Sequence, residues 1–305
     1  MEHDEIIRDL RRYADLIAAT LHAPSGNFPR ETDETVQVER GALLASAVVG
    51  PSAVDTEVVD RLVALTARPD RLSQISVIDA AGHARPVYRP LLLYAWLASY
   101  RIAYEALPPS AFGRWDEALR PWCDLLEAEL GRISVAESGT PALRGGSAAE
   151  AAWTALALYV AGKIFVRDAW TDLAADTFGR LARGQQPSGA FLLAATSDNP
   201  EPLWYHELAI LHAAASYAVQ AEERNLARAV ARSTAFIQSS IEPDHATGQP
   251  WGVFAFIWNP ATRPLADQLL HAVSLRQPQL DGVSLIVLAD ALYCLRRFTE
   301  PEPKS

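Results

Sequence analysis

The chain has 305 residues, of which 50% are hydrophobic and 21% charged, and its formal net charge is −10. This composition provides a sizeable core, and no basic cluster offers the positive face that a nucleic-acid backbone requires. Cys123 and Cys294 are too few for a disulfide framework and lie in no metal-binding spacing. We therefore expect a cytoplasmic protein that binds no nucleic acid, no metal and no cofactor.

The first predicted element is an amphipathic helix from Glu5 to Leu21. Its apolar stripe includes Ile6, Leu10 and Ile17, which recur at helical spacing. Acidic residues stand at the start of the chain, where a secretory signal would be basic and then apolar. The longest apolar run, residues 282–295, is short and is interrupted by an aspartate. We expect neither a signal peptide nor an integral membrane segment.

Further segments with helical spacing follow, each about 13 to 22 residues long. They begin near Val36, Ser52, Pro86, Ala111, Ser147, Val166, Pro202, Ala221, Arg263 and Leu280. No segment has a convincing strand pattern. The sequence therefore predicts an all-α protein.

The predicted helices are of two kinds. Those from Val166 and Ala221 have charged residues on one side, whereas those from Ser147, Pro202 and Leu280 are apolar almost all round. A helix without a polar face must be buried on every side. Alternation of the two kinds predicts an inner ring of helices inside an outer ring, an α/α toroid of about five or six helical hairpins in one domain, residues 1–305. Its long loops would share one rim, where a pocket would form.

A turn motif supports this architecture. The stretch QQPSGAF, residues 185–191, shares its Pro-Ser-Gly-x-Phe core with HAPSGNF, residues 22–28. We expect the prolines to stop a helix, Gly189 to adopt a positive φ, Phe191 to pack inward and Gln185 to cap a helix end. The two stretches should therefore form equivalent turns on the same rim.

This motif resembles the Gln/Trp repeat of the terpenoid cyclase and protein prenyltransferase toroids, with Phe191 in place of the usual tryptophan. The resemblance implies a central, aromatic-lined pocket that takes an apolar isoprenoid or polycyclic small molecule. Squalene cyclases use an Asp-x-Asp-Asp motif, and prenyltransferases bind zinc through an Asp-x-Cys motif. Neither motif is present here, so neither family's catalytic residues carry over to this chain.

Candidate catalytic residues lie in two neighbouring segments. Tyr205, His206 and Glu207 follow Pro200 and Pro202, so they are expected in the first turn of an inner helix, facing the rim. There the helix N-terminus favours neutral imidazole, the form that a general base needs. We expect His206 to border the central cavity.

The next long loop, residues 242–256, contributes further groups, Asp244 and His245. Together with the first segment they would provide acid–base catalysis. Candidate substrate-binding residues are Trp204, Trp251, Arg89 and His212. Each of these residues also has a structural interpretation, as a hydrogen-bonded core residue, a turn cap or an ion-pair partner.

Three functions are compatible with this sequence. The first is a terpenoid-cyclase-like enzyme, in which ring faces stabilise carbocations and a carboxylic acid starts or ends the reaction. The second is a carbohydrate lyase or glycoside hydrolase, because α/α toroids also carry such activities. The third is a toroid that binds a ligand without catalysis.

Overall fold

The computed structural model describes residues 3–22, 76–78, 84–86, 89–104, 146–192, 201–243, 248–275 and 280–299. These residues are helical apart from turns and one antiparallel pair of strands, β1 (Ser76–Ile78) and β2 (Ala84–Pro86). The prediction of an all-α protein is confirmed for this part of the chain. The small strand pair was not expected from the sequence. The helices predicted near Val36, Ser52 and Ala111 lie outside the described residues, as do the turn at residues 24–26 and the side chain of Arg89.

The helices are α1 (His3–His22), α4 (Arg89–Tyr104), α6 (Gly146–Phe165), α7 (Asp168–Gly184), α8 (Glu201–Gln220), α9 (Arg224–Ser240), α11 (Val253–Trp258), α12 (Arg263–Ser274) and α13 (Gly282–Thr299). Side chains cap the first turns of α9 and α13. At α9, the Glu223 carboxylate accepts from the N–H of Asn225. At α13, Asp281 accepts from both the N–H and the hydroxyl of Ser284. These bonds satisfy backbone donors that have no partner within the helix.

Helices α6, α8 and α13 are buried on all sides. From Ala148 to Gly162 in α6 only Glu150 is exposed, and α8 is buried continuously from Glu207 to Gln220. The prediction that uniformly apolar helices lie in the interior is confirmed for these elements. Since almost every side of such a helix touches other protein atoms, its position is fixed by packing rather than by an amphipathic stripe.

Helices α7 and α9 bury only one face. In α7 the buried residues are Trp170, Ala174, Phe178 and Leu181, spaced by three or four positions as one helical stripe requires. The charged residues of α7 and α9 all lie outside these buried faces, so the two helices cover the core, as the sequence predicted.

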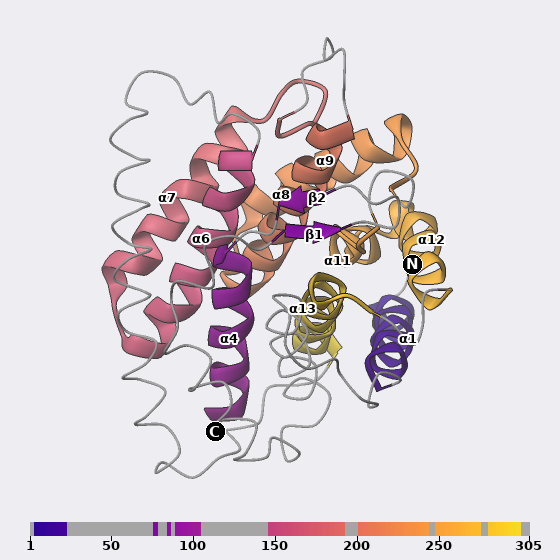
Figure 1. The fold of residues 1–305 in the computed structure, drawn as a ribbon, viewed down its shortest axis with the longest axis horizontal. Coiled ribbons are helices and arrows are strands. Elements are labelled where there is room, and N and C mark those ends of the chain that lie inside the picture. The colour runs from indigo at the N-terminus through magenta and orange to yellow at the C-terminus, as the bar shows by residue number, and fades with distance from the viewer. Residues whose placement is uncertain are drawn as a thin grey trace.

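The packing partners follow this division. Helix α6 packs against α4, α7 and α8; α8 also contacts α9, α11 and α13; and α13 contacts α1, α4 and α11. Figure 1 shows α6 and α7 running side by side, and α13 and α1 as neighbours seen nearly end-on. Each fully buried helix therefore contacts both buried and amphipathic helices.

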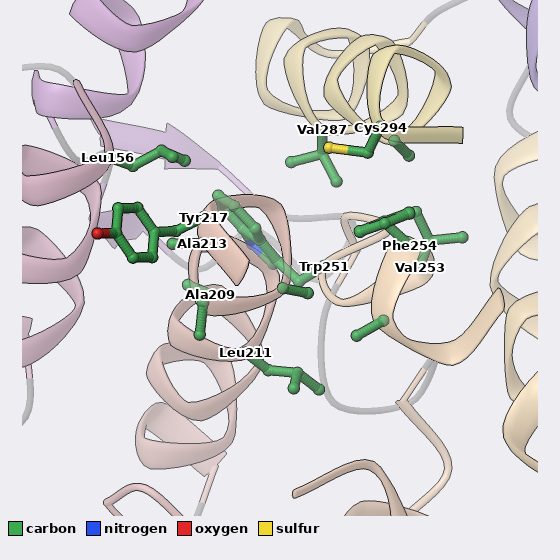
Figure 2. Packing of buried hydrophobic residues seen from close by; sticks show 14 of the residues in the cluster. Leu156, Ala209, Leu211, Ala213, Tyr217, Trp251, Val253, Phe254, Val287 and Cys294 are labelled. Carbon is green, nitrogen blue, oxygen red and sulfur yellow. The ribbon is translucent and has the colours of Figure 1, made fainter. Parts of the chain in front are cut away.

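Residues 242–256, interpreted from the sequence as one long loop, contain the short helix α11, so that interpretation was wrong for their last part. Gly252 precedes α11 with φ of 79°, a conformation that costs glycine little. The first five residues of α11 are buried, so tertiary packing stabilises a helix too short to form alone. In Figure 2, Trp251 lies beside α8, and Val287 and Cys294 project toward this layer from α13.

The start of α8 differs from the sequence expectation. The helix begins at Glu201, with Pro202 inside its first turn, and Tyr205, His206 and Glu207 therefore lie in the second turn. Proline is accommodated in a first turn because the N–H it lacks would have no partner there. Pro202 therefore lies within the first turn of α8, and the helix does not wait until after this proline to begin.

The turn at Gly189 forms as predicted. Gly189 has φ of 100°, and Phe191 is buried in the core. The side-chain amide of Gln185, which caps α7, donates to the carbonyls of Gly189 and Ala229 at 2.8 Å each. Its oxygen accepts from Arg232, so one glutamine joins the end of α7, the turn and α9.

Replacing Gly189 with alanine is expected to destabilise the protein by about 2 to 4 kcal/mol. The added Cβ would lie 2.6 Å from the carbonyl oxygen of Arg232, and the positive φ would strain any side chain. Urea unfolding measures the loss. Gly184→Ala is the matched control: it has nothing within 4 Å and is expected to be neutral or slightly stabilising. Equal stability of the two variants would contradict the prediction.

Candidate functional site

Six polar side chains from α4, α8 and α13 form a buried cluster, which we call the Asp290 network. On α8, His212, Ser216 and Gln220 stand at successive intervals of four residues and so share one face. The remaining members are Tyr94 on α4 and Asp290 and Cys294 on α13. Each member is at most 4% exposed. Polar groups so deeply buried require hydrogen-bond partners, and each of the six has at least one within the cluster. The side-chain oxygen of Gln220 is buried without a partner among the described residues.

The Asp290 carboxylate is the common acceptor of the network. His212 Nε2 lies 3.0 Å from Oδ2 of Asp290, and the Ser216 hydroxyl donates to Oδ1 at 3.1 Å. The Tyr94 hydroxyl also donates to Oδ1. Three donors, from α4 and α8, thus converge on one carboxylate of α13.

Gln220 supports this arrangement from one side. Its amide nitrogen donates to the Tyr94 hydroxyl oxygen and to the Ser216 hydroxyl oxygen, at 2.9 Å each. Cys294 Sγ lies 3.5 Å from the same serine oxygen. Since the Ser216 proton is directed at Asp290, the Cys294 thiol is the donor in this last contact. The hydrogen bonds consequently run in one direction, toward the carboxylate.

A main-chain contact sets the tautomer of His212. The N–H of Gly252 donates to Nδ1 at 3.3 Å, so Nδ1 carries no proton and Nε2–H points at Asp290. Both imidazole nitrogens are therefore occupied. Ser216 donates to the carboxylate and not to His212, so the three residues do not form the Ser–His–Asp relay of a hydrolase.

Aromatic rings enclose the network. The Trp153 indole stacks on the His212 imidazole, with centroids 5.9 Å apart and planes at 19°. Trp251 approaches the same imidazole edge-on at 6.2 Å, and Tyr94 lies 5.6 Å from Trp153. The carboxylate thus lies in a region of low polarity, where electrostatic interactions are strong.

Burial keeps the acidic groups around Asp290 protonated. It raises the pKa of Tyr94 well above its usual value of 10, and the charge of Asp290 adds to the effect. Burial, followed by the same charge, also raises the pKa of the Cys294 thiol well above its usual value. Tyr94 is therefore a neutral donor at ordinary pH, and Cys294 is not an activated thiolate.

Only part of the sequence-predicted site adjoins this cluster. His212 is a member of the network and Trp251 lines it, while Tyr205 is buried with its ring edge-on to Trp251 at 5.8 Å. His206 is half-buried and meets Tyr205 edge-on. Asp244 and His245 lie outside the described residues, and only the backbone of Arg89 is described.

Glu207 and Trp204 have other packing roles. The Glu207 carboxylate is fully buried and accepts from the N–H groups of Phe191 at 2.6 Å and Leu192 at 2.7 Å. It therefore anchors the chain after the Gly189 turn. The Trp204 ring stacks on Phe236 of α9 at 5.7 Å, at the interface between α8 and α9.

The sequence did contain signals for the residues that were missed. Asp290 is a charged residue within an apolar helix, where a buried carboxylate needs partners. Ser216 and Gln220 continue the polar stripe that begins at His212. Tyr94 had no such signal, because its relation to Asp290 depends on the packing of α4 near α13.

The described part of the chain contains no group of three or more His, Cys, Asp or Glu residues that could hold a metal ion. None of its helices combines the length and hydrophobicity needed to cross a membrane. No protein-family model, curated protein or solved structure matches this chain. The interpretation of the site therefore depends on its own geometry.

The substitution Asp290→Asn is expected to cost about 3 to 5 kcal/mol of stability. An amide cannot accept from all three donors, and its own N–H₂ would face one of them. Asp267 provides a matched control, because it accepts from the Tyr13 hydroxyl at 2.9 Å but is exposed. Asp267→Asn should cost less than about 1 kcal/mol in the same urea titration. Similar losses in the two variants would show that the network is not a specially stabilising one.

Alkaline pH is expected to destabilise the fold. Burial raises the pKa of Tyr94 well above 10 and the pKa of both Tyr13 and Tyr217 to about 12. The folded protein holds these protons more tightly than the unfolded chain does. Their contribution to stability is therefore complete below pH 10 and is lost as the pH rises through the folded-state pKa values.

Urea unfolding at increasing pH, with phenolate absorbance recorded in parallel, measures this effect. Tyr94→Phe should make the decline above pH 10 less steep, because one raised pKa is removed. Stability that stays constant while all tyrosines ionise in the folded state would contradict the prediction.

Proposed function

We propose that the protein is an α/α toroid enzyme that isomerises or cyclises an apolar small molecule, with Asp290 as its acid–base group. The observation that carries the proposal is a fully buried carboxylate that accepts from three neutral donors, one of which, His212, is packed between two indole rings. Such a site suits a reaction in which positive charge develops on a hydrocarbon.

The packing order of the helices supports the toroid. Contacts link α4 to α6, α6 to α8, α8 to α11, α11 to α13, and α13 back to α4, a closed sequence of inner helices. Helix α7 packs against α6 and α12 against α11, while α9 contacts α8 and α11, and α1 contacts α13 and α11. In a toroid of this order the Asp290 network belongs to the inner layer, facing the axis.

The electrostatics support cationic chemistry in particular. His212 is neutral in its assigned tautomer, and no arginine or lysine among the described residues pairs with Asp290. The carboxylate charge is therefore uncompensated by a cation. Ring faces of Trp153 and Trp251 would stabilise a carbocation nearby, and the carboxylate would add to that stabilisation.

Such a reaction consumes no net proton. Before the substrate binds, the Asp290 carboxylate takes up one proton from solvent. The protonated Asp290 then gives this proton to one carbon of a double bond, whose electron pair forms the new C–H bond and leaves a carbocation on the other carbon. After rearrangement, the carboxylate removes a proton from a neighbouring carbon, and that C–H electron pair forms the new double bond. One proton is given and one is returned, so the reaction needs no co-reactant. The three donors stabilise Asp290 while it is ionised.

The carbohydrate alternative receives less support from this geometry. Glycoside hydrolysis needs two carboxyl groups facing one substrate, one as acid and one as base or nucleophile. Of the two fully buried carboxylates described, Glu207 is bound by backbone N–H groups at the Gly189 turn. A toroid that binds without catalysis would show the same aromatic surroundings but no turnover.

Incubation of the protein with apolar isoprenoids, analysed by gas chromatography and mass spectrometry, tests the proposal. The expected product has the same mass as its substrate. Asp290→Asn should lower turnover by about 10² or more, as loss of an acid–base group does. Ser216→Ala keeps the carboxylate but removes one donor and should lower turnover roughly tenfold.

Two further variants identify the acid–base group. His206→Ala should reduce turnover by about 10² only if His206 is itself that group. The exposed Asp267→Asn should retain full activity. Circular dichroism confirms that each variant is folded. Binding of an isoprenoid without any product would favour the non-catalytic toroid, and full activity of folded Asp290→Asn would exclude Asp290 as the acid–base group.

A further inference from the structure

A groove of about 210 Å³ lies between α1 and α13, two helices that pack against each other. It is lined by Arg11, Ala14, Asp15 and Ala18 of α1 and by Leu292, Arg296 and Thr299 of α13. Within each helix these residues fall on one face, because steps of three and four positions return to the same side. The volume is below the range of about 300 to 1,000 Å³ that is usual for drug-sized ligands, so the groove suits a small molecule.

Part of the lining is apolar. Ala14 and Leu292 are buried, and Ala18 is half-buried. Ala14 and Ala18 are four residues apart, so they lie one above the other on α1, and their side chains end at Cβ. Longer side chains at these two positions would fill the space between the helices. This part of the lining can therefore pack against an apolar group of a few carbon atoms.

The charged part of the lining carries two cations, Arg11 and Arg296, and one anion, Asp15. Arg11 Nη2 donates to the Thr299 carbonyl at 3.1 Å, which joins α1 to the end of α13 and limits the freedom of the guanidinium. A guanidinium has five N–H donors, so each arginine can hold one acceptor of the protein and still bind a carboxylate. Asp15 forms no ion pair with any described residue. The groove therefore offers donors to an anion and an acceptor to a cation.

We propose that this groove binds a free α-amino acid with a small apolar side chain. The carboxylate of the ligand matches the N–H donors of Arg11 and Arg296, and its ammonium group matches the carboxylate of Asp15. Its side chain packs against the two alanines and Leu292. A phosphate ion would be repelled by Asp15, and a purely apolar molecule would cover three charged side chains without pairing them. An amino acid satisfies all parts of the lining at once.

The groove is separate from the Asp290 network. Leu292 stands two positions after Asp290 in α13, so the two side chains leave the helix on different sides. No member of the network lines the groove. Amino-acid binding therefore does not depend on the proposed isomerase or cyclase activity.

Isothermal titration calorimetry with L-leucine tests the site, and two analogues test the role of each charge. 4-Methylpentanoate lacks the ammonium group of leucine, and 3-methylbutylamine lacks its carboxylate. Because Arg11 and Asp15 are exposed, water screens both contacts, and we expect a Kd for leucine on the order of 1 mM. Each analogue should bind about tenfold more weakly.

Three results would overturn the proposal. The first is the absence of leucine binding at about 10 mM. The second is binding of either analogue as tight as that of leucine, because the group it lacks would then make no contact. The third is binding of inorganic phosphate as tight as that of leucine, which would show a simple anion site.

Variants locate the binding. Ala18→Leu keeps every charge but fills the groove, and Arg11→Gln and Asp15→Asn each remove one charge, so each should weaken leucine binding about tenfold. Asp15 is exposed, so its variant should fold even if Ala18→Leu does not. The exposed Arg228→Gln, on α9, removes a charge elsewhere and should bind like the wild type. Circular dichroism checks that each variant is folded. Equal weakening in Arg228→Gln, or unchanged binding in folded Asp15→Asn, would refute this location.

Discussion

The carboxylate of Asp290 is the group on which the arrangement of the buried helices α4, α8 and α13 depends. A charge buried in this way costs several kcal/mol unless donors surround it. The donors here come from α4 and α8, while the carboxylate belongs to α13. Three helices distant in sequence must therefore keep one relative position for the charge to be satisfied. Apolar packing alone tolerates small shifts between helices, but hydrogen bonds of about 3 Å do not.

The same constraint extends to the aromatic surroundings. His212 can donate to Asp290 only in the tautomer that the Gly252 N–H selects, and Gly252 leads directly into α11. Trp153 and Trp251 then pack against the oriented imidazole. The conformation of Gly252, which lies between Trp251 and α11, thus affects how His212 is oriented toward Asp290, the proposed catalytic carboxylate.

Helix α8 contacts two buried carboxylates, its own Glu207 and Asp290 of α13. At its beginning, Glu207 holds the chain after the Gly189 turn through two backbone N–H groups. Further along, His212 and Ser216 direct their donors at Asp290. Beyond them, Gln220 connects this network to Tyr159 through its backbone carbonyl. One helix thereby connects the Gly189 turn, the Asp290 network and the phenol of Tyr159.

The amino-acid sequence by itself determined the helical class, the division into uniformly apolar and amphipathic helices, and the turn at Gly189. These properties depend on local spacing and on the conformational freedom of single residues, which a sequence displays directly. It also identified His212 and Trp251 as candidates. Only the tertiary structure decided that Glu207 anchors a turn, that α11 forms within a presumed loop, and that Tyr94 meets Asp290. The physical reason is that a buried polar group acquires its role from partners on other elements, and Tyr94 and Asp290 are 196 residues apart in the chain.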